Sequence, residues 1–149
     1  MSTDAVSPSK VSRQMALQGI DIPFSVLKSS DAFIAQVHEG VPSIVVQQAI
    51  EVLGHRKQLL KILGEKPANL GHVYRRNRLD KARSESVLSF IRLYSEAVGV
   101  FKSLERADDW LSTALPAFDG RCPIELCDTF EGRGLVTAAL RKIENGDFS

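Results

Sequence analysis

One long amphipathic stretch, residues 81–102, constrains the fold more than any other feature of the chain. Apolar side chains recur along it at intervals of three and four residues, the spacing that gathers them on one face of an α-helix. These side chains are Val87, Leu88, Ile91, Leu93, Tyr94, Val98 and Phe101. A helix of this length exceeds the average of about 11–12 residues. We therefore expect it to bridge the two halves of the chain.

Proline and glycine divide the residues before this stretch at regular intervals. The pattern predicts helices at residues 31–39, 42–53, 56–63 and 67–76. Ser30 is expected to cap the first helix, and Pro42 and Pro67 to open the second and the fourth. Glycines follow the first three and are typical helix ends. Residues 1–30 are polar and rich in serine, so we expect a flexible N-terminal arm there.

The residues after the long stretch predict shorter helices at 105–113, 123–127 and 130–145, with Thr129 as the cap of the last one. No segment alternates apolar and polar residues between hairpin turns. The sequence therefore predicts an all-α fold in which a helix-turn-helix-like bundle, residues 31–103, is joined by the long helix to a small helical domain, residues 104–149.

Composition excludes several classes of protein. The chain is 44% hydrophobic and 25% charged, which is ordinary for a globular protein. It has no apolar run of the roughly 20 residues that a membrane span needs, and residues 1–10 lack the apolar core of a secretory signal. We therefore expect a cytoplasmic protein that makes no membrane contact. Cys122 and Cys127 have no histidine nearby, so we interpret them as small core residues and expect no metal or cofactor.

Charge is unevenly distributed along the chain. Residues 55–83 hold nine lysines and arginines against two acids, a net charge of +7, whereas residues 104–149 hold five against nine, a net charge of −4. Such a division suits two different partners, one anionic and one basic. The alternative is a pair of solvated faces without a partner.

The basic region coincides with a helical hairpin. Residues 56–63, a turn containing Gly64, and residues 67–76 have the form of a helix-turn-helix unit. Asparagine and arginine read base edges in the major groove, and lysine and arginine hold phosphates. The predicted DNA-binding residues are Lys57, Lys66, Asn69, His72, Arg75, Arg76 and Arg78. Leu60 and Glu65 depart from the usual pattern, so the hairpin could instead be a scaffold that does not read DNA.

A distinctive series of residues occupies the C-terminal third. It comprises Trp110-Leu111, Gly120, Pro123-Ile124, Thr129, Gly132, Val136, Leu140 and Glu144-Asn145-Gly146. This series resembles the toxin-binding domain of the Xre/MbcA/ParS antitoxin family, and the resemblance extends more weakly back to Val41. Phe118-Asp119 replaces the usual Leu-Gly pair before Gly120, without altering the order of the other motifs.

Two sets of residues follow from this resemblance. The structural framework consists of Trp110, Leu111, Gly120, Pro123, Thr129, Gly132, Val136 and Leu140. We expect Trp110, Pro123 and Val136 in the core, and Gly120 in a tight turn because glycine tolerates a left-handed backbone. The candidate toxin-binding residues are Glu131, Arg133, Arg141, Glu144, Asn145, Asp147, Phe148 and Ser149.

The resemblance also implies a mechanism. Such antitoxins are partnered with RES-domain toxins, which consume NAD, and the C-terminal helix and tail would occlude the active site. The tail, residues 147–149, offers an acid, an aromatic ring and a terminal carboxylate. These groups would complement a basic dinucleotide cleft; a disordered terminus is the alternative.

Operon autoregulation through the hairpin is a second expected role. It calls for a homodimer, because two recognition helices must lie about one DNA turn apart. An enzyme is not indicated, because the chain lacks a glycine-rich phosphate loop, paired metal ligands and a nucleophile elbow. The alternative function is a dimeric helix-turn-helix transcriptional regulator without a toxin partner.

Overall fold

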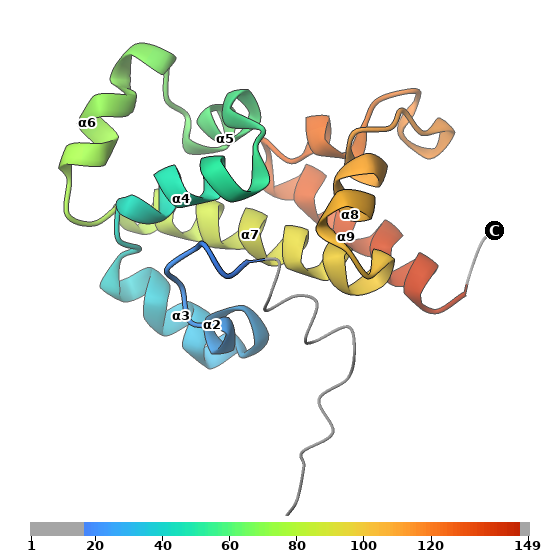
Figure 1. Cartoon of the computed structure of the whole chain (residues 1–149), viewed down its shortest axis with the longest axis horizontal. Coiled ribbons are helices and arrows are strands. Elements are labelled where there is room, and N and C mark those ends of the chain that lie inside the picture. The colour runs from blue at the N-terminus through green and yellow to red at the C-terminus, as the bar shows by residue number, and fades with distance from the viewer. Residues whose placement is uncertain (1–16, 147–149) are drawn as a thin grey trace, which may run out of the picture.

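The computed structural model describes residues 17–146, and these residues fold into α-helices joined by short turns of 3-10 helix (Figure 1). The α-helices are α2 (Phe24–Lys28), α3 (Ser30–Glu39), α4 (Ile44–Leu53), α5 (Arg56–Leu63), α6 (Leu70–Arg75), α7 (Lys81–Phe101), α8 (Leu104–Leu111) and α9 (Phe130–Glu144). The 3-10 turns are η1 (Pro67–Asn69), η2 (Pro116–Phe118) and η3 (Pro123–Leu126). Within this part of the chain, extended backbone pairs only in two isolated bridges, Pro42 with Arg78 and Leu115 with Arg121. The all-α prediction is confirmed.

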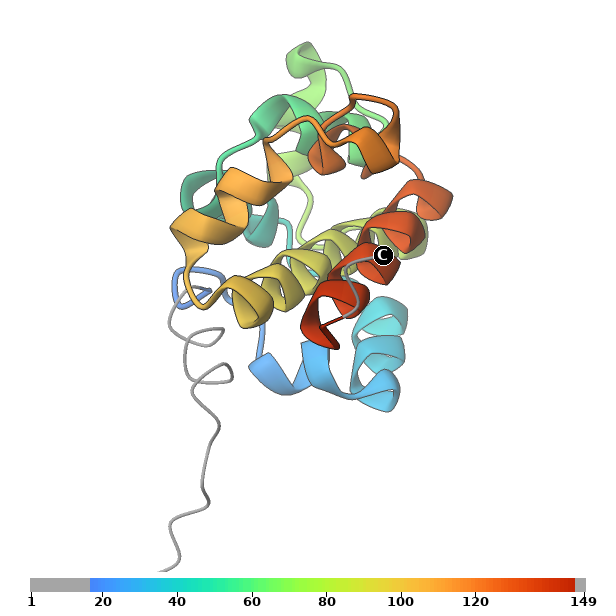
Figure 2. The same ribbon diagram turned by 90° about the vertical axis from the view of Figure 1, so that its right-hand side faces the viewer.

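Helix α7 is the long predicted helix, and it forms the centre of the molecule. It packs against α2, α3, α5, α8 and α9, and Figures 1 and 2 show these helices arranged around it. Lys102 ends it in a left-handed conformation, with a φ of 71°. The buried side chains of α7 belong to one continuous cluster that runs from Leu17 to Leu140. The two sequence-predicted halves therefore share a single apolar core.

Residues 17–30 differ from the predicted flexible arm. Leu17, Ile20 and Val26 are buried, and α2 packs against α3 and α7. The backbone N–H of Asp21 donates to Gln48 Oε1 at 2.7 Å, which fixes this segment to α4. The weak apolar pattern of these residues is sufficient because α4 and α7 supply the surface they bury. Residues 1–16 lie outside the described part of the chain.

Several helix ends shift slightly from their predicted positions. Ser29, not Ser30, caps α3, because its side chain accepts a hydrogen bond from the Ala32 N–H. Pro42 lies before α4 rather than in its first turn, because it pairs with Arg78 in an isolated bridge. Helix α5 has the predicted bounds, and Thr129 caps α9 as expected, accepting from Gly132 N at 2.9 Å. Local capping chemistry therefore sets most of the boundaries.

Both cysteines carry free thiols. Cys127 is completely buried, and burial raises the pKa of its thiol to about 12. Its packing agrees with the prediction of a small core residue. No helix within residues 17–146 combines the length and the apolar character that a membrane crossing requires.

Candidate functional site

The predicted framework residues assemble α8, η3 and α9 into one unit against α7. Leu111, Val136 and Leu140 are buried, and Pro123 is buried at the start of η3. Trp110 is only half-buried; its ring lies 5.5 Å from that of Phe101, measured between centroids. The tryptophan therefore closes the edge of the core rather than filling its centre.

Glycine at position 132 is required by the close approach of α9 to η3. A Cβ atom on Gly132 would lie 1.7 Å from the carbonyl oxygen of Leu126, which no conformational adjustment of a side chain can relieve. Thr129, three residues earlier, caps the same helix turn. The Thr-x-x-Gly motif thus begins α9 and seats it on the preceding turn.

The outer surface of α9 exposes apolar side chains. We call it the α9 face; its members are Phe130, Glu131, Gly134, Leu135, Ala138 and Arg141, and all are exposed. Phe130 is 81% exposed and Leu135 is 51% exposed. Gly134 and Ala138, in the middle of the face, have the smallest side chains. A Cβ atom on Gly134 would meet nothing within 4 Å. An exposed aromatic ring and leucine on such a flat helix surface are typical of a protein-binding site.

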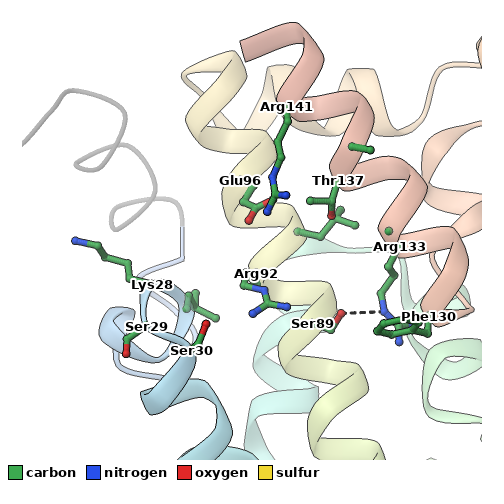
Figure 3. A pocket seen from close by; sticks show the side chains of 14 residues that line it. Lys28, Ser29, Ser30, Ser89, Arg92, Glu96, Phe130, Arg133, Thr137 and Arg141 are labelled. Carbon is green, nitrogen blue, oxygen red and sulfur yellow. Dashed lines mark hydrogen bonds between the residues drawn. The ribbon is translucent and has the colours of Figure 1, made fainter. Parts of the chain in front are cut away.

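A groove runs beside the α9 face, with walls from α2–α3, α7 and α9. We call it the α7–α9 groove; its volume is about 460 Å³. Its polar lining residues are Lys28, Ser29, Ser30, Ser89, Arg92, Glu96, Arg133, Thr137 and Arg141 (Figure 3). Phe130 lines it as well and therefore belongs to both surfaces. Among these residues Glu96 is the sole acid.

Arg133, one of the predicted toxin-binding residues, is largely buried and lines the α7–α9 groove. Its side chain is 7% exposed, Nε donates to Ser89 Oγ at 2.9 Å, and Nη1 donates to the Cys127 carbonyl oxygen at 2.9 Å. Burial lowers the pKa of this guanidinium. Arg133 lies three and seven residues before two core residues, Val136 and Leu140, so helical spacing directs it inward. It fixes α9 to α7 and η3.

Comparison with known proteins agrees with this geometry. Residues 96–146, which include the end of α7, α8 and α9, match the family model of the antitoxin Xre/MbcA/ParS C-terminal toxin-binding domain. The Prs ADP-ribosylating antitoxin of Sphingobium sp. (strain YBL2) is 29% identical over 127 residues, covering 78% of this chain and 80% of the relative. Over residues 96–146 the chain is therefore similar to the toxin-binding domain of the Xre/MbcA/ParS antitoxins. Helix α9 and its surfaces lie inside the matched range.

The other predicted toxin-binding residues divide into two groups. Glu131, Arg141, Glu144 and Asn145 are exposed on α9 or at its end. Asp147, Phe148 and Ser149 lie outside the described residues. Sequence reasoning missed Phe130 and Leu135 as candidates. The sequence could have indicated their exposure, because both are large apolar residues that fall outside the stripe of positions 132, 136 and 140 on the helix.

The basic hairpin buries its apolar side chains, with α5 packed against α7 and α6 against α4 and η1. Leu59, Leu60 and Leu63 of α5 are buried, as are Leu70 and Val73 of α6. The predicted DNA contacts that are exposed and lie on or near these helices are Lys57, Lys66, Asn69, His72, Arg75 and Arg76.

Arg78 is also exposed, but its side chain is engaged within the protein. Nη1 donates to the Gly40 carbonyl oxygen at 2.8 Å, and Nη2 lies 3.4 Å from the Glu39 carboxylate. These contacts connect the end of α3 to the loop before α7. Arg78 therefore has a structural role that the sequence did not indicate.

The unusual acid in the hairpin turn, Glu65, has a structural explanation. Its side chain is 12% exposed and forms an ion pair with Arg83, which also donates to Asp80 at 2.6 Å. Burial alone would lower the pKa of Arg83, and the two carboxylates outweigh it and raise that pKa. A charged residue therefore replaces the usual apolar one and anchors the turn to the start of α7.

Within residues 17–146, no group of three or more His, Cys, Asp and Glu side chains is arranged to hold a metal ion.

Proposed function

We propose that this antitoxin neutralises a RES-domain, NAD-consuming toxin by docking the α9 face on it and covering its active site with the end of α9 and the tail. The observation that carries the proposal is the exposure of Phe130 and Leu135 within the toxin-binding domain. Complete burial of such a side chain contributes about 1.5–3 kcal/mol. Two such anchors, one on each side of Gly134 and Ala138 on the α9 face, would supply a large part of the energy of an interface.

Charged and polar residues around these anchors form a suitable rim. Glu131, Arg141, Glu144 and Asn145 are exposed beside the apolar positions. Polar groups at a rim contribute mostly to orientation and to the rate of association, whereas desolvated aromatic anchors at the centre contribute most of the binding energy. We therefore assign specificity to the rim and affinity to Phe130 and Leu135.

NAD chemistry supports the identity of the toxin class. The name of the Sphingobium relative includes the word ADP-ribosylating, and ADP-ribosylation ordinarily draws its ADP-ribose from NAD. A site that binds the phosphates of NAD carries positive charge, and Asp147 in the tail would complement it. Phe148 would fill an adjacent apolar subsite.

The test of the docking face uses the protein encoded in the neighbouring reading frame as the toxin. Phe130→Ala and Leu135→Ala, singly and together, should weaken binding by at least 10-fold and restore NAD depletion in cells that express the toxin. Ile44→Ala is the matched control, because Ile44 is 53% exposed on α4, outside the matched domain. Unchanged affinity of the double variant would contradict the proposed face.

The tail is tested separately. Deleting residues 145–149 should leave the toxin bound through the α9 face but catalytically active. If the truncated antitoxin still blocks NAD loss, occlusion by the tail is wrong, while docking on α9 stands.

We also propose that a homodimer of the antitoxin binds operator DNA through the basic hairpin. The observation in favour is the exposure of six of the predicted contacts, among them Asn69, Arg75 and Arg76. Binding to the operator would make the antitoxin a regulator of its own operon and would place it in the cytoplasm. A band shift with the DNA upstream of the antitoxin gene tests this role.

A further inference from the structure

We propose that the α7–α9 groove receives an acidic segment of the toxin, whose carboxylates pair with Arg92, Arg133 and Arg141. This inference rests on the proposed function, because Phe130 lines both the groove and the α9 face. A toxin docked over Phe130 would therefore extend across the mouth of the groove. The inference adds a specific chemistry, carboxylate recognition, to the apolar contact.

The groove is a cationic site within an otherwise acidic region. Residues 104–149 carry five basic residues against nine acids, yet two of those five, Arg133 and Arg141, line this groove together with Arg92 of α7. Figure 3 shows the Arg92 side chain in the space between α3 and α9, and Arg141 extending from α9 toward Glu96. The groove thus brings three arginines together, and this local positive charge would attract an acidic segment.

Two of the guanidinium groups are held in position before any partner binds. The guanidinium carbon of Arg92 lies 4.2 Å from the centroid of the Phe33 ring, so an aromatic surface orients it while its N–H edges remain available. Arg133 uses Nε and Nη1 for Ser89 and Cys127, and its Nη2 has no hydrogen-bond partner within the described residues. Fixed donors lose little side-chain entropy on pairing with a carboxylate.

The presence of Glu96 favours a peptide over a nucleic acid or a free phosphate. Its carboxylate lines the groove beside the arginines, so the lining is not uniformly cationic, whereas a phosphate chain carries a charge at every unit. The carboxylates of a peptide are several ångströms apart. A peptide can therefore lie along the groove without placing one of them opposite Glu96. The hydroxyl groups of Ser30 and Thr137, also in the lining, add neutral hydrogen-bonding capacity along the same path.

The experiment measures the affinity of the full-length antitoxin for the protein of the neighbouring reading frame at several salt concentrations. Arg92→Gln with Arg141→Gln should raise the Kd by at least 10-fold and flatten its salt dependence, because exposed charge pairs are screened by salt. The matched control is Arg106→Gln with Arg121→Gln. It removes the same charge from two exposed arginines of the matched domain that do not line the groove, and should change the Kd by less than 3-fold.

The single variant Arg141→Gln shows whether a loss of affinity in the double variant comes from misfolding. Arg141 is exposed, whereas Arg92 contacts Phe33 and its replacement could disturb the fold. This single variant should melt like the wild type and still raise the Kd at least 3-fold. Equal reductions of affinity in the groove and control doubles would mean a general charge effect and would overturn the inference.

Two further outcomes separate this inference from the proposed function. If the groove variants bind normally while Leu135→Ala, which lies outside the groove lining, binds weakly, the α9 face stands and the groove inference is wrong. If inorganic phosphate, added at constant ionic strength, raises the melting temperature of the wild type but not of the groove double, and toxin affinity is unchanged, the groove is a small-anion site and the inference is also wrong.

Discussion

His55 Nε2 lies 2.5 Å from Asp108 Oδ1, and the hydroxyl group of Tyr94 donates to the same carboxylate oxygen. His55 precedes α5 in a left-handed conformation, Tyr94 is buried on α7, and Asp108 lies on α8. The three side chains therefore connect the basic hairpin, the central helix and the toxin-binding domain at one point. This polar junction complements the shared apolar core, because it fixes the orientation of α8 relative to α5.

The first prediction concerns the strength of this junction. Tyr94→Phe should lower the free energy of unfolding by about 1 kcal/mol, the usual contribution of one hydrogen bond, as measured by urea denaturation. Asp108→Asn should cost at least as much, because it weakens the contacts to both Tyr94 and His55. Asp109→Asn is the control; its exposed side chain should leave stability within about 0.5 kcal/mol. Equal stability of all three variants would contradict a role for the junction.

The second prediction is a dependence of stability on pH through Asp108. Burial alone would raise the pKa of this carboxyl group, and the hydrogen bonds from Tyr94 and His55 outweigh burial and hold the pKa below its usual value. The ionised group therefore stabilises the fold above the unfolded pKa of about 3.9, and this contribution disappears as the pH falls through the lower native value. Between pH 6 and pH 2.5, the wild type should lose more unfolding free energy than Asp108→Asn. Parallel curves would exclude this carboxylate as a source of acid sensitivity.

The third prediction compares two glycines of α9. Gly132→Ala should destabilise the protein by about 1–3 kcal/mol or more, the range for overpacking, because the added methyl group would overlap the Leu126 carbonyl oxygen. Gly134→Ala should stabilise it by about 0.5–1 kcal/mol, since that position is open and alanine favours a helix. Thermal melts of the two variants should shift in opposite directions. A similar shift in both would mean that α9 does not approach η3 closely at Gly132.

These glycines illustrate how far the sequence predicts the structure. Thr129 and the glycines after α4 and α5 act on their own helix turns, so their local pattern was sufficient to place the helix ends. The hydrogen bond of Arg133 to Ser89 was not predicted, because the two residues are 44 positions apart. The junction between His55 and Asp108 spans 53 positions. The α7–α9 groove combines three segments for the same reason. Long-range polar pairing leaves no periodic signal in a sequence, whereas helix caps and apolar stripes do.

The fourth prediction concerns the ion pair between Glu65 and Arg83. Glu65→Gln should lower the free energy of unfolding by about 1–2 kcal/mol, between the values for exposed and buried pairs, because the pair is partly buried. Asp80→Asn is an informative comparison, since Asp80 contacts Arg83 from a more exposed position. A double-mutant cycle between Glu65 and Arg83 isolates their coupling. Additive effects in that cycle would mean that the turn is held by its apolar contacts alone.

The fifth prediction separates DNA binding from structural support among three neighbouring arginines. Arg75→Ala with Arg76→Ala should weaken binding to the upstream DNA and reduce the slope of log K against log salt by about 0.9 for each phosphate that is no longer neutralised. The fold should be unaffected, because both side chains are exposed. Arg78→Ala should instead lower the melting temperature, since it removes the hydrogen bond to the Gly40 carbonyl oxygen and the ion pair with Glu39. If the double variant binds DNA like the wild type, the hairpin is a scaffold and DNA binds elsewhere. If Arg78→Ala melts normally but no longer binds DNA, its interactions with α3 are dispensable and the side chain serves the DNA.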